Sequence, residues 1–176
     1  ISAVVDVLKS DWLTTGPAIT DFESDLCNAT GAEFSVALSS GTAALHATMF
    51  AIEVSSNDEV IVPAITFAAT ANAVSYQGGT PVFVDVDPDT LLLDVSEVEN
   101  KMTGKTKAIV CVDYAGQPGD YESLLRIAEN SGVKIISDGC HSLGAEYKGR
   151  NVGSIADITT FSFHPVNTLL VAREGR

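Results

Sequence analysis

The sequence predicts an α/β fold of three layers, in which helices cover both faces of a mostly parallel β-sheet. Short continuous apolar runs, typical of strands buried on both faces, alternate with longer segments of helical periodicity. Glycine, proline or acidic residues separate the two kinds of segment. The chain has 176 residues, 45% of them hydrophobic, which suffices for one domain with a substantial core.

Two helices and a strand are expected in the first part of the chain. Residues 2–10 carry apolar side chains at helical spacing. Residues 21–29 show the same spacing, and Gly31 suits the C-terminal end of that helix. Residues 34–38 (FSVAL) then predict a buried strand.

Helices and strands alternate along the rest of the chain. A helix is expected to begin near Ser40, and a second, alanine-rich helix to begin with Thr66 and Phe67. Further helices are predicted at residues 96–102 and 121–130. The strands are predicted at residues 59–62, 81–85, 107–112, 133–137 and 156–163.

Charge and cysteine content narrow the classes of function. Ten basic residues against 23 acidic ones give a net charge of −13, which disfavours nucleic acid as a partner. A phosphate-bearing ligand must therefore be held by local donors. No apolar run approaches the roughly 18 residues of a membrane span, and the N-terminus does not resemble a signal peptide. Cys27, Cys111 and Cys140 show no C-x-x-C spacing, which fits a reduced cytoplasmic compartment and no metal site, and Cys111 is expected in the core.

An acidic residue ends the predicted strand at residues 133–137. Asp138 is followed by Gly139, and His141 lies three residues beyond the acid. Ligands of parallel sheets bind beyond the carboxyl ends of the strands, where a carboxylate can face a cationic ring nitrogen. Taken alone, an Asp-Gly pair is also a common turn, and such an acid often only caps the next helix.

Two helix starts are further candidates for a binding site. Gly41 and Thr42 stand where a strand meets a helix, and exposed N–H groups at the positive end of a helix dipole bind phosphate. The pattern is neither G-x-G-x-x-G nor a P-loop, which weakens a nicotinamide or nucleoside triphosphate hypothesis. Phe67 can stack on a planar ring. The alternatives are a simple N-cap at Ser40 and ordinary core packing of Phe67.

Five short motifs lie at residues 12–17 (WLTTGP), 40–46 (SGTAALH), 63–70 (PAITFAAT), 138–144 (DGCHSLG) and 161–166 (FSFHPV). In this order, and over nearly the whole chain, they resemble the motifs of the DegT/DnrJ/EryC1/StrS sugar aminotransferases. Members of that family are fold-type-I enzymes that depend on pyridoxal 5'-phosphate (PLP). Residues 112–116 and 144–147 are similar to the branch that makes 4-amino sugars for pseudaminic acid.

The resemblance implies a role for each candidate residue. Asp138 would pair with the pyridine nitrogen of PLP and favour its protonated form, so that the ring remains an electron sink. His141 would lie against the ring or hydrogen-bond near its phenolic oxygen, and Phe67 would stack on the other face. The phosphate would be held by Gly41, Thr42 and Ser162.

The position of the family's catalytic lysine is occupied by Asn167. In the family, that lysine binds PLP as a Schiff base and moves the proton. An amide side chain can do neither. The resemblance also implies that residues 1–176 are the N-terminal part of the large PLP-binding domain, without the C-terminal small domain.

The function implied is amino transfer from an amino acid, with glutamate the expected donor, to a nucleotide-linked keto sugar, in a homodimer. Asn167 leaves three explanations open: an omitted lysine, a truncated and inactive homologue, or a lysine-less PLP enzyme such as a sugar-nucleotide dehydratase, although the family's 3-dehydratases have histidine there.

Overall fold

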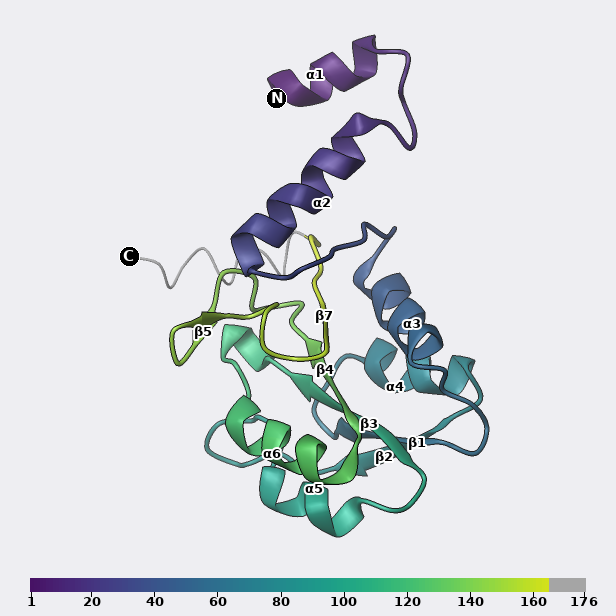
Figure 1. Ribbon diagram of the computed structural model, residues 1–176, viewed down its shortest axis with the longest axis vertical. Helices are drawn as coiled ribbons and strands as arrows, with labels where there is room; N and C mark the ends of the chain where they lie inside the picture. The colour runs from purple at the N-terminus through teal and green to yellow at the C-terminus, as the bar shows by residue number, and fades with distance from the viewer. Residues whose placement is uncertain (165–176) are drawn as a thin grey trace. The chain divides into compact units, whose positions relative to one another are not determined.

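The computed structural model describes residues 1–164 (Figure 1). The chain divides into two compact units, one formed by residues 1–37 and the other beginning at Leu38. Within residues 1–164, none of the helices is both long and apolar enough to cross a lipid bilayer. Asn167 lies outside the described residues.

The first unit contains helices α1 (Ser2–Lys9) and α2 (Pro17–Thr30). Helix α2 begins four positions before the predicted start, because Pro17 supplies a first helical residue with a preset φ and no need for an N–H partner. It ends at Gly31, whose φ of 75° is the left-handed conformation expected there.

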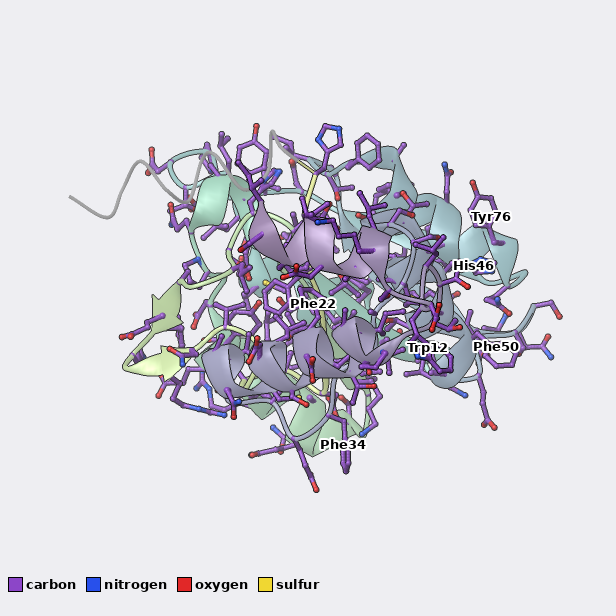
Figure 2. The ribbon with its side chains drawn as sticks, turned by 90° about the horizontal axis from the view of Figure 1, so that it is seen from above. Trp12, Phe22, Phe34, His46, Phe50 and Tyr76 are labelled. Carbon is purple, nitrogen blue, oxygen red and sulfur yellow. The ribbon has the colours of Figure 1, made fainter. Side chains whose placement is uncertain are left out.

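The strand predicted at residues 34–38 is wrong. The segment pairs with no described strand, and Phe34 and Val36 are 79% and 73% exposed. Figure 2 labels the Phe34 side chain, which projects outward from this segment. The segment is hydrogen-bonded instead to α2. Ser35 Oγ donates to the Glu23 carbonyl at 2.6 Å, and the Ala37 N–H donates to Glu23 Oε1 at 2.8 Å. A continuous apolar run predicts an extended chain, but not whether another strand is available to pair with it.

The second unit is built on a five-stranded parallel sheet in the order β2-β1-β3-β4-β7. Its strands are β1 (Glu59–Pro63), β2 (Thr80–Val84), β3 (Thr106–Val112), β4 (Lys134–Asp138) and β7 (Ile158–Thr160). A small antiparallel hairpin joins β5 (Glu146–Tyr147) to β6 (Arg150–Asn151). The sheet confirms the predicted α/β class.

Helices cover both faces of the sheet (Figure 1). Helices α3 (Gly41–Ala51) and α4 (Ala68–Tyr76) pack on one face, and α5 (Val95–Lys101) and α6 (Tyr121–Ser131) on the other. Successive residues of β3 alternate between the two cores: Val110 packs with α3 and α4, whereas Cys111 packs with α6 and is fully buried. The prediction that Cys111 is a core residue is therefore confirmed.

In the second unit, two predicted elements differ from the structure by two or more residues at an end. Helix α4 begins at Ala68, so that Phe67 is its N-cap residue in extended conformation and not part of the first turn. Strand β7 has three residues where the sequence predicted eight. Before these three residues, the Asp157 N–H donates to the Ile135 carbonyl at 3.0 Å, but the Ile135 N–H is accepted by the Asp157 carboxylate at 2.9 Å, so a side-chain oxygen replaces a backbone acceptor at the start of the strand. The Gly139 N–H donates to the Thr160 carbonyl at its end.

The strand order places a change of direction between β1 and β3. The chain leaves β1 toward β2, crosses back to β3, and then continues away from β1 to β4 and β7. Ligands of open parallel sheets bind beyond the carboxyl ends of the strands at such a point. The loops that follow β1, β3, β4 and β7 meet at this edge, and they include the short 3-10 helix η1 (Tyr114–Gly116) after β3.

Candidate functional site

The carboxylate of Asp138 is held at the end of β4 by a helix on one face of the sheet. Asp138 is 5% exposed, and Thr70 of α4 donates its hydroxyl proton to Oδ2 at 2.9 Å. Thr66 lies 2.8 Å from the Thr70 hydroxyl and must be the donor, because the single Thr70 proton is used. The Cys140 N–H reaches Oδ1 at 3.4 Å. The acid therefore has a fixed orientation and is not turned into bulk water.

The N-terminus of α3 carries free backbone donors. Ser40 caps the helix: its side chain accepts the Ala43 N–H at 3.1 Å, and its carbonyl accepts the Ala44 N–H. The amides of Gly41 and Thr42 have no acceptor among residues 1–164. Two N–H groups at the positive end of an 11-residue helix are thus available to an anion.

Gly41 brings this helix end against two other loops of the sheet edge. A Cβ added to Gly41 would lie 3.1 Å from the Ser162 Cβ and 3.2 Å from the Cys140 Sγ. Any residue other than glycine at position 41 would therefore crowd Ser162 and Cys140. The helix start, the turn after β4 and the segment after β7 therefore converge, with the Ser162 hydroxyl 3.5 Å from the position of a Gly41 Cβ.

The amides of Gly41 and Thr42 and the hydroxyl of Ser162 form a group of donors that we call the cradle. The Cys140 thiol lies at its edge and is uncharged. Burial raises its pKa well above the ordinary thiol value, and the negative charge of Asp138 raises it further. A thiolate here would repel a bound anion, and the raised pKa prevents one from forming at neutral pH. Cys140 is consequently a wall of the cradle and a poor nucleophile.

His141 and Phe67 lie on two different loops of the same edge. His141 is half-buried in the turn after β4, and its ring meets the Tyr114 ring edge-on, with centroids 6.4 Å apart. Phe67 precedes α4 and is 75% exposed, so it is not part of the core. The structure thus brings Asp138, Gly41, Thr42 and Ser162 to one edge with His141, while the Phe67 side chain remains open to solvent.

Two residues at this edge, Thr70 and Asp113, were not predicted from the sequence to belong to the site. Thr70 was part of a motif but had no role, although a spacing of four in the predicted helix, which began with Thr66, would have put both hydroxyls on one side. In the structure Thr66 precedes α4, and its hydroxyl still lies 2.8 Å from that of Thr70. Asp113 directly follows β3, much as Asp138 ends β4, and it is completely buried. An acid directly after an apolar strand was the signal that identified Asp138, and the same signal would have found Asp113.

The site suits a flat, phosphorylated heteroaromatic ring. Free amides and hydroxyls at Gly41, Thr42 and Ser162 can hold a phosphate without a cation. The buried Asp138 carboxylate can pair with a protonated ring nitrogen, and the turn through Cys140 joins it to the cradle. These residues therefore fit both ends of such a molecule.

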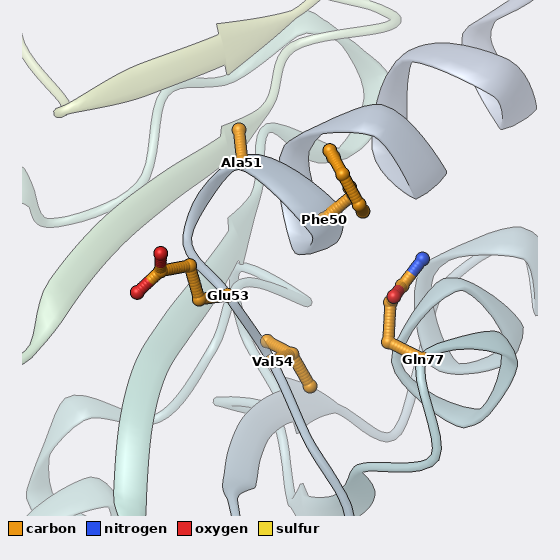
Figure 3. A pocket seen from close by; sticks show the side chains of 5 residues that line it. All are labelled: Phe50, Ala51, Glu53, Val54 and Gln77. Atoms are coloured by element: carbon orange, nitrogen blue, oxygen red, sulfur yellow. The ribbon is translucent and has the colours of Figure 1, made fainter.

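A separate surface pocket lies at the opposite end of α3. Its volume is about 400 Å³, and its lining is Phe50, Ala51, Glu53, Val54 and Gln77 (Figure 3). Beside it, Gln77 Nε2 lies 2.8 Å from His46 Nε2, and the His46 and Tyr76 rings meet edge-on (Figure 2). None of the lining residues belongs to the sheet edge, and the pocket holds no set of donors for an anion. We place the candidate site at the sheet edge.

The chain is similar to proteins of one family over its whole length. A sequence model of the DegT/DnrJ/EryC1/StrS aminotransferase family matches residues 1–175. An uncharacterized protein of Methanocaldococcus jannaschii is 43% identical over 175 residues, which is 99% of this chain and 45% of that protein. The chain thus spans about half the length of this relative.

Solved structures agree with this similarity. Spr1654 of Streptococcus pneumoniae, solved in PLP, apo and PMP forms, is 40% identical with a TM-score of 0.90, over 93% of this chain and 45% of Spr1654. PseC of Helicobacter pylori, an aminotransferase involved in the biosynthesis of pseudoaminic acid, is 36% identical with a TM-score of 0.86, over 93% of this chain and 44% of PseC.

Proposed function

Because this chain belongs to the DegT/DnrJ/EryC1/StrS aminotransferase family, we propose that it forms the PLP-binding part of an enzyme that transfers an amino group to a keto sugar. One observation carries the proposal. A buried, oriented carboxylate at Asp138 and a phosphate cradle at Gly41 and Ser162 lie at the same sheet edge, joined by the turn through Cys140.

In this proposal the phosphate of PLP is held by backbone and hydroxyl donors. The amides of Gly41 and Thr42 bind it at the start of α3, and the hydroxyls of Thr42 and Ser162 complete the cradle. No lysine or arginine is needed, since charge-assisted bonds from N–H groups to an anion are strong in a partly buried site.

Asp138 determines the charge of the cofactor ring. Its carboxylate would pair with the pyridine nitrogen and favour the protonated ring, because a buried anion next to a cation favours the charged form. When bound, PLP would supply an electron sink for the loss of a proton from the amino-acid carbon. Thr70 fixes the acid in place, and His141 and Phe67 would flank the ring, as the family resemblance implies.

The finer assignments rest on the family and on its named members. We propose glutamate as the amino donor and a nucleotide-linked keto sugar as the acceptor, as the family resemblance implies. A homodimer in the cytoplasm and a role for residues 1–176 as the N-terminal part of the large domain belong to the same proposal. The chain spans about half the length of the M. jannaschii relative and of Spr1654, so the activity, substrates and partners of a whole family protein enter here only as part of this proposal.

Asn167 favours a second candidate function. An asparagine at the position of the family's lysine can neither bind the cofactor covalently nor move a proton. A chain with this residue would hold PLP only through Asp138 and the phosphate cradle. It would then be a lysine-less enzyme, such as a sugar-nucleotide dehydratase, or an inactive homologue.

The test compares the chain with its Asn167→Lys variant. Both are incubated with PLP, reduced with borohydride and examined by intact mass spectrometry, with parallel titration of PLP absorbance. We expect both proteins to bind PLP and only the lysine variant to retain it covalently. Failure of both to bind PLP would refute the cofactor assignment.

Product analysis then separates the two functions. Each protein is incubated with PLP, glutamate and a nucleotide-linked keto sugar. An amino sugar formed by the lysine variant supports amino transfer as the family activity of this site. A deoxy sugar formed by the asparagine protein supports the dehydratase. The matched control is Asp138→Ala in each background, which should abolish either product.

A further inference from the structure

A second carboxylate lies beneath the site, fully enclosed and without a cation. Asp113 is 0% exposed, and neither of the ion pairs found in residues 1–164, Lys134–Asp157 and Lys148–Glu122, involves it. An unpaired buried anion opposes folding unless hydrogen bonds compensate for the lost water. The hydrogen bonds that Asp113 accepts therefore identify the segments that its carboxylate connects.

Each oxygen of Asp113 binds a different part of the fold. Oδ1 accepts the Gly119 N–H at 3.1 Å and the Tyr121 hydroxyl at 2.8 Å, both at the start of α6. Oδ2 accepts the Ser142 hydroxyl at 2.6 Å. The Ser137 hydroxyl lies 3.2 Å from Oδ2 and 2.6 Å from the Tyr121 hydroxyl, and can donate to either.

The backbone around Asp113 binds the same turn. The Asp113 N–H donates to the Asp138 carbonyl at 3.1 Å. Two and three residues beyond it, Ala115 and Gly116 have φ values of 55° and 87°, and a Cβ on Gly116 would lie 3.1 Å from the His141 carbonyl oxygen. The loop after β3 is thus fitted closely to the turn after β4.

The loop after β3 contacts His141 in two ways, through the neighbouring residue and through the ring. The neighbouring residue Ser142 is tied to Asp113, and the His141 ring meets Tyr114, the residue after Asp113. The Ser142 N–H also closes the turn onto the Gly139 carbonyl at 3.0 Å. With Asp138 fixed at one end of the turn and Ser142 at the other, little freedom is left to His141.

We propose that Asp113 is a positioning residue, which through Ser142 sets the turn carrying Asp138 and His141 in the geometry that binds the cofactor ring. This inference rests on the proposed function for its ligand, but the geometry exists without one. Asp113 touches neither ring nor phosphate in this proposal; it acts through Ser142.

The experiment uses Asp113→Asn and Ser142→Ala in the full chain. The matched control is Asp157→Asn, because Asp157 is also a carboxylate bound to β4, but at the opposite end of the strand. The readouts are the PLP dissociation constant, the NMR signals of the His141 imidazole, and hydrogen–deuterium exchange of residues 139–142 in the PLP-free chain.

We expect both test variants to bind PLP about tenfold more weakly, as expected for the loss of a hydrogen bond to a charged group. They should also shift the His141 signals and exchange faster in the turn, whereas Asp157→Asn should leave all three readouts at the wild-type values. Unchanged His141 signals and exchange in both variants would overturn the proposal.

Two other outcomes are also decisive. If Asp113→Asn fails to fold, Ser142→Ala decides alone, since it removes one bond and leaves the other donors to Asp113 in place. If the wild-type chain binds no PLP, the proposed function fails, and the His141 signals and exchange of the PLP-free chain still decide whether Asp113 positions the turn.

Discussion

The Thr70 hydroxyl and the Asp138 carboxylate are joined by a 2.9 Å hydrogen bond between residues that are 68 positions apart in the sequence. Thr70 is completely buried and Asp138 nearly so. The bond links α4, on one face of the sheet, to the end of β4, so that the helix determines the direction of the carboxylate.

Replacing Thr70 with valine should weaken cofactor binding and the fold together. Valine keeps the shape but removes the donor to a buried carboxylate, a loss of about 1–3 kcal/mol in the free energy of unfolding. Thr70→Ser retains the hydroxyl and serves as the control. The measurements are urea unfolding and PLP titration; a valine variant that binds PLP like the wild type would contradict the role of this bond.

The Gly41→Ala variant should separate ligand binding from stability. The added methyl meets Ser162 and Cys140 at 3.1–3.2 Å and crowds the phosphate cradle, so we expect PLP to bind about tenfold more weakly. Alanine is a better helix former than glycine by up to about 1 kcal/mol, so stability should hold. Gly104→Ala, where a Cβ meets nothing within 4 Å, is the matched control. Equal PLP affinity in the two variants would place the phosphate elsewhere.

Gly119→Ala should strongly lower the free energy of unfolding, and the additional substitution Cys111→Ala should restore part of it. A Cβ on Gly119 would lie 2.1 Å from the Cys111 Sγ, a distance that no packing can absorb, and overpacking of this kind costs about 1–3 kcal/mol or more. Cys111→Ala removes that sulfur. In a double-mutant cycle by urea unfolding, the pair should be more stable than Gly119→Ala alone. Additive losses would mean that the clash is not the cause.

Asp113 should make stability fall as pH rises through the acid range. Burial raises its pKa above the ordinary 3.8, so between 3.8 and the raised value the folded state binds more protons than the unfolded state. The stability of the wild type minus that of Asp113→Asn should therefore be greatest below pH 3.8, decrease through this window, and level off above it.

The difference between the two proteins is the informative quantity. Hydrogen bonds from Ser55 and Thr90 lower the pKa values of Asp58 and Asp87, which act in the opposite direction and cancel in the comparison. Unfolding is measured by urea at several pH values. A difference that grows with pH would show that the hydrogen bonds of Asp113 outweigh its burial.

Much of the sheet could be predicted because buried parallel strands are continuous apolar runs. The strands at 107–112 and 133–137 lie within one residue of β3 and β4. The order β2-β1-β3-β4-β7 was not predicted, because apolar runs do not specify their neighbours. For the same reason residues 34–38 were assigned to a strand that does not exist.

The site was only partly predictable. Asp138 could be expected at this edge because it follows a predicted strand, and Gly41 because it begins a predicted helix. Ser162 lay inside the predicted strand at residues 156–163, and only the family resemblance pointed to it. The structure brings the three residues together. Their roles toward a cofactor stay predictions. The contacts of Thr70 and Asp113 depend on how α4 and the β3 loop pack, and residue spacing along the chain does not determine that packing.

The place of β7 at the end of the sheet has a consequence for biosynthesis. Gly41 leaves the ribosome early, whereas Ser162 emerges some 120 residues later and reaches Gly41 only after β7 has paired with β4. A nascent chain therefore cannot bring these two residues together before Ser162 has emerged. Any small molecule held by both residues would bind only after the sheet has assembled, so its binding would stabilise the folded sheet over the unfolded chain.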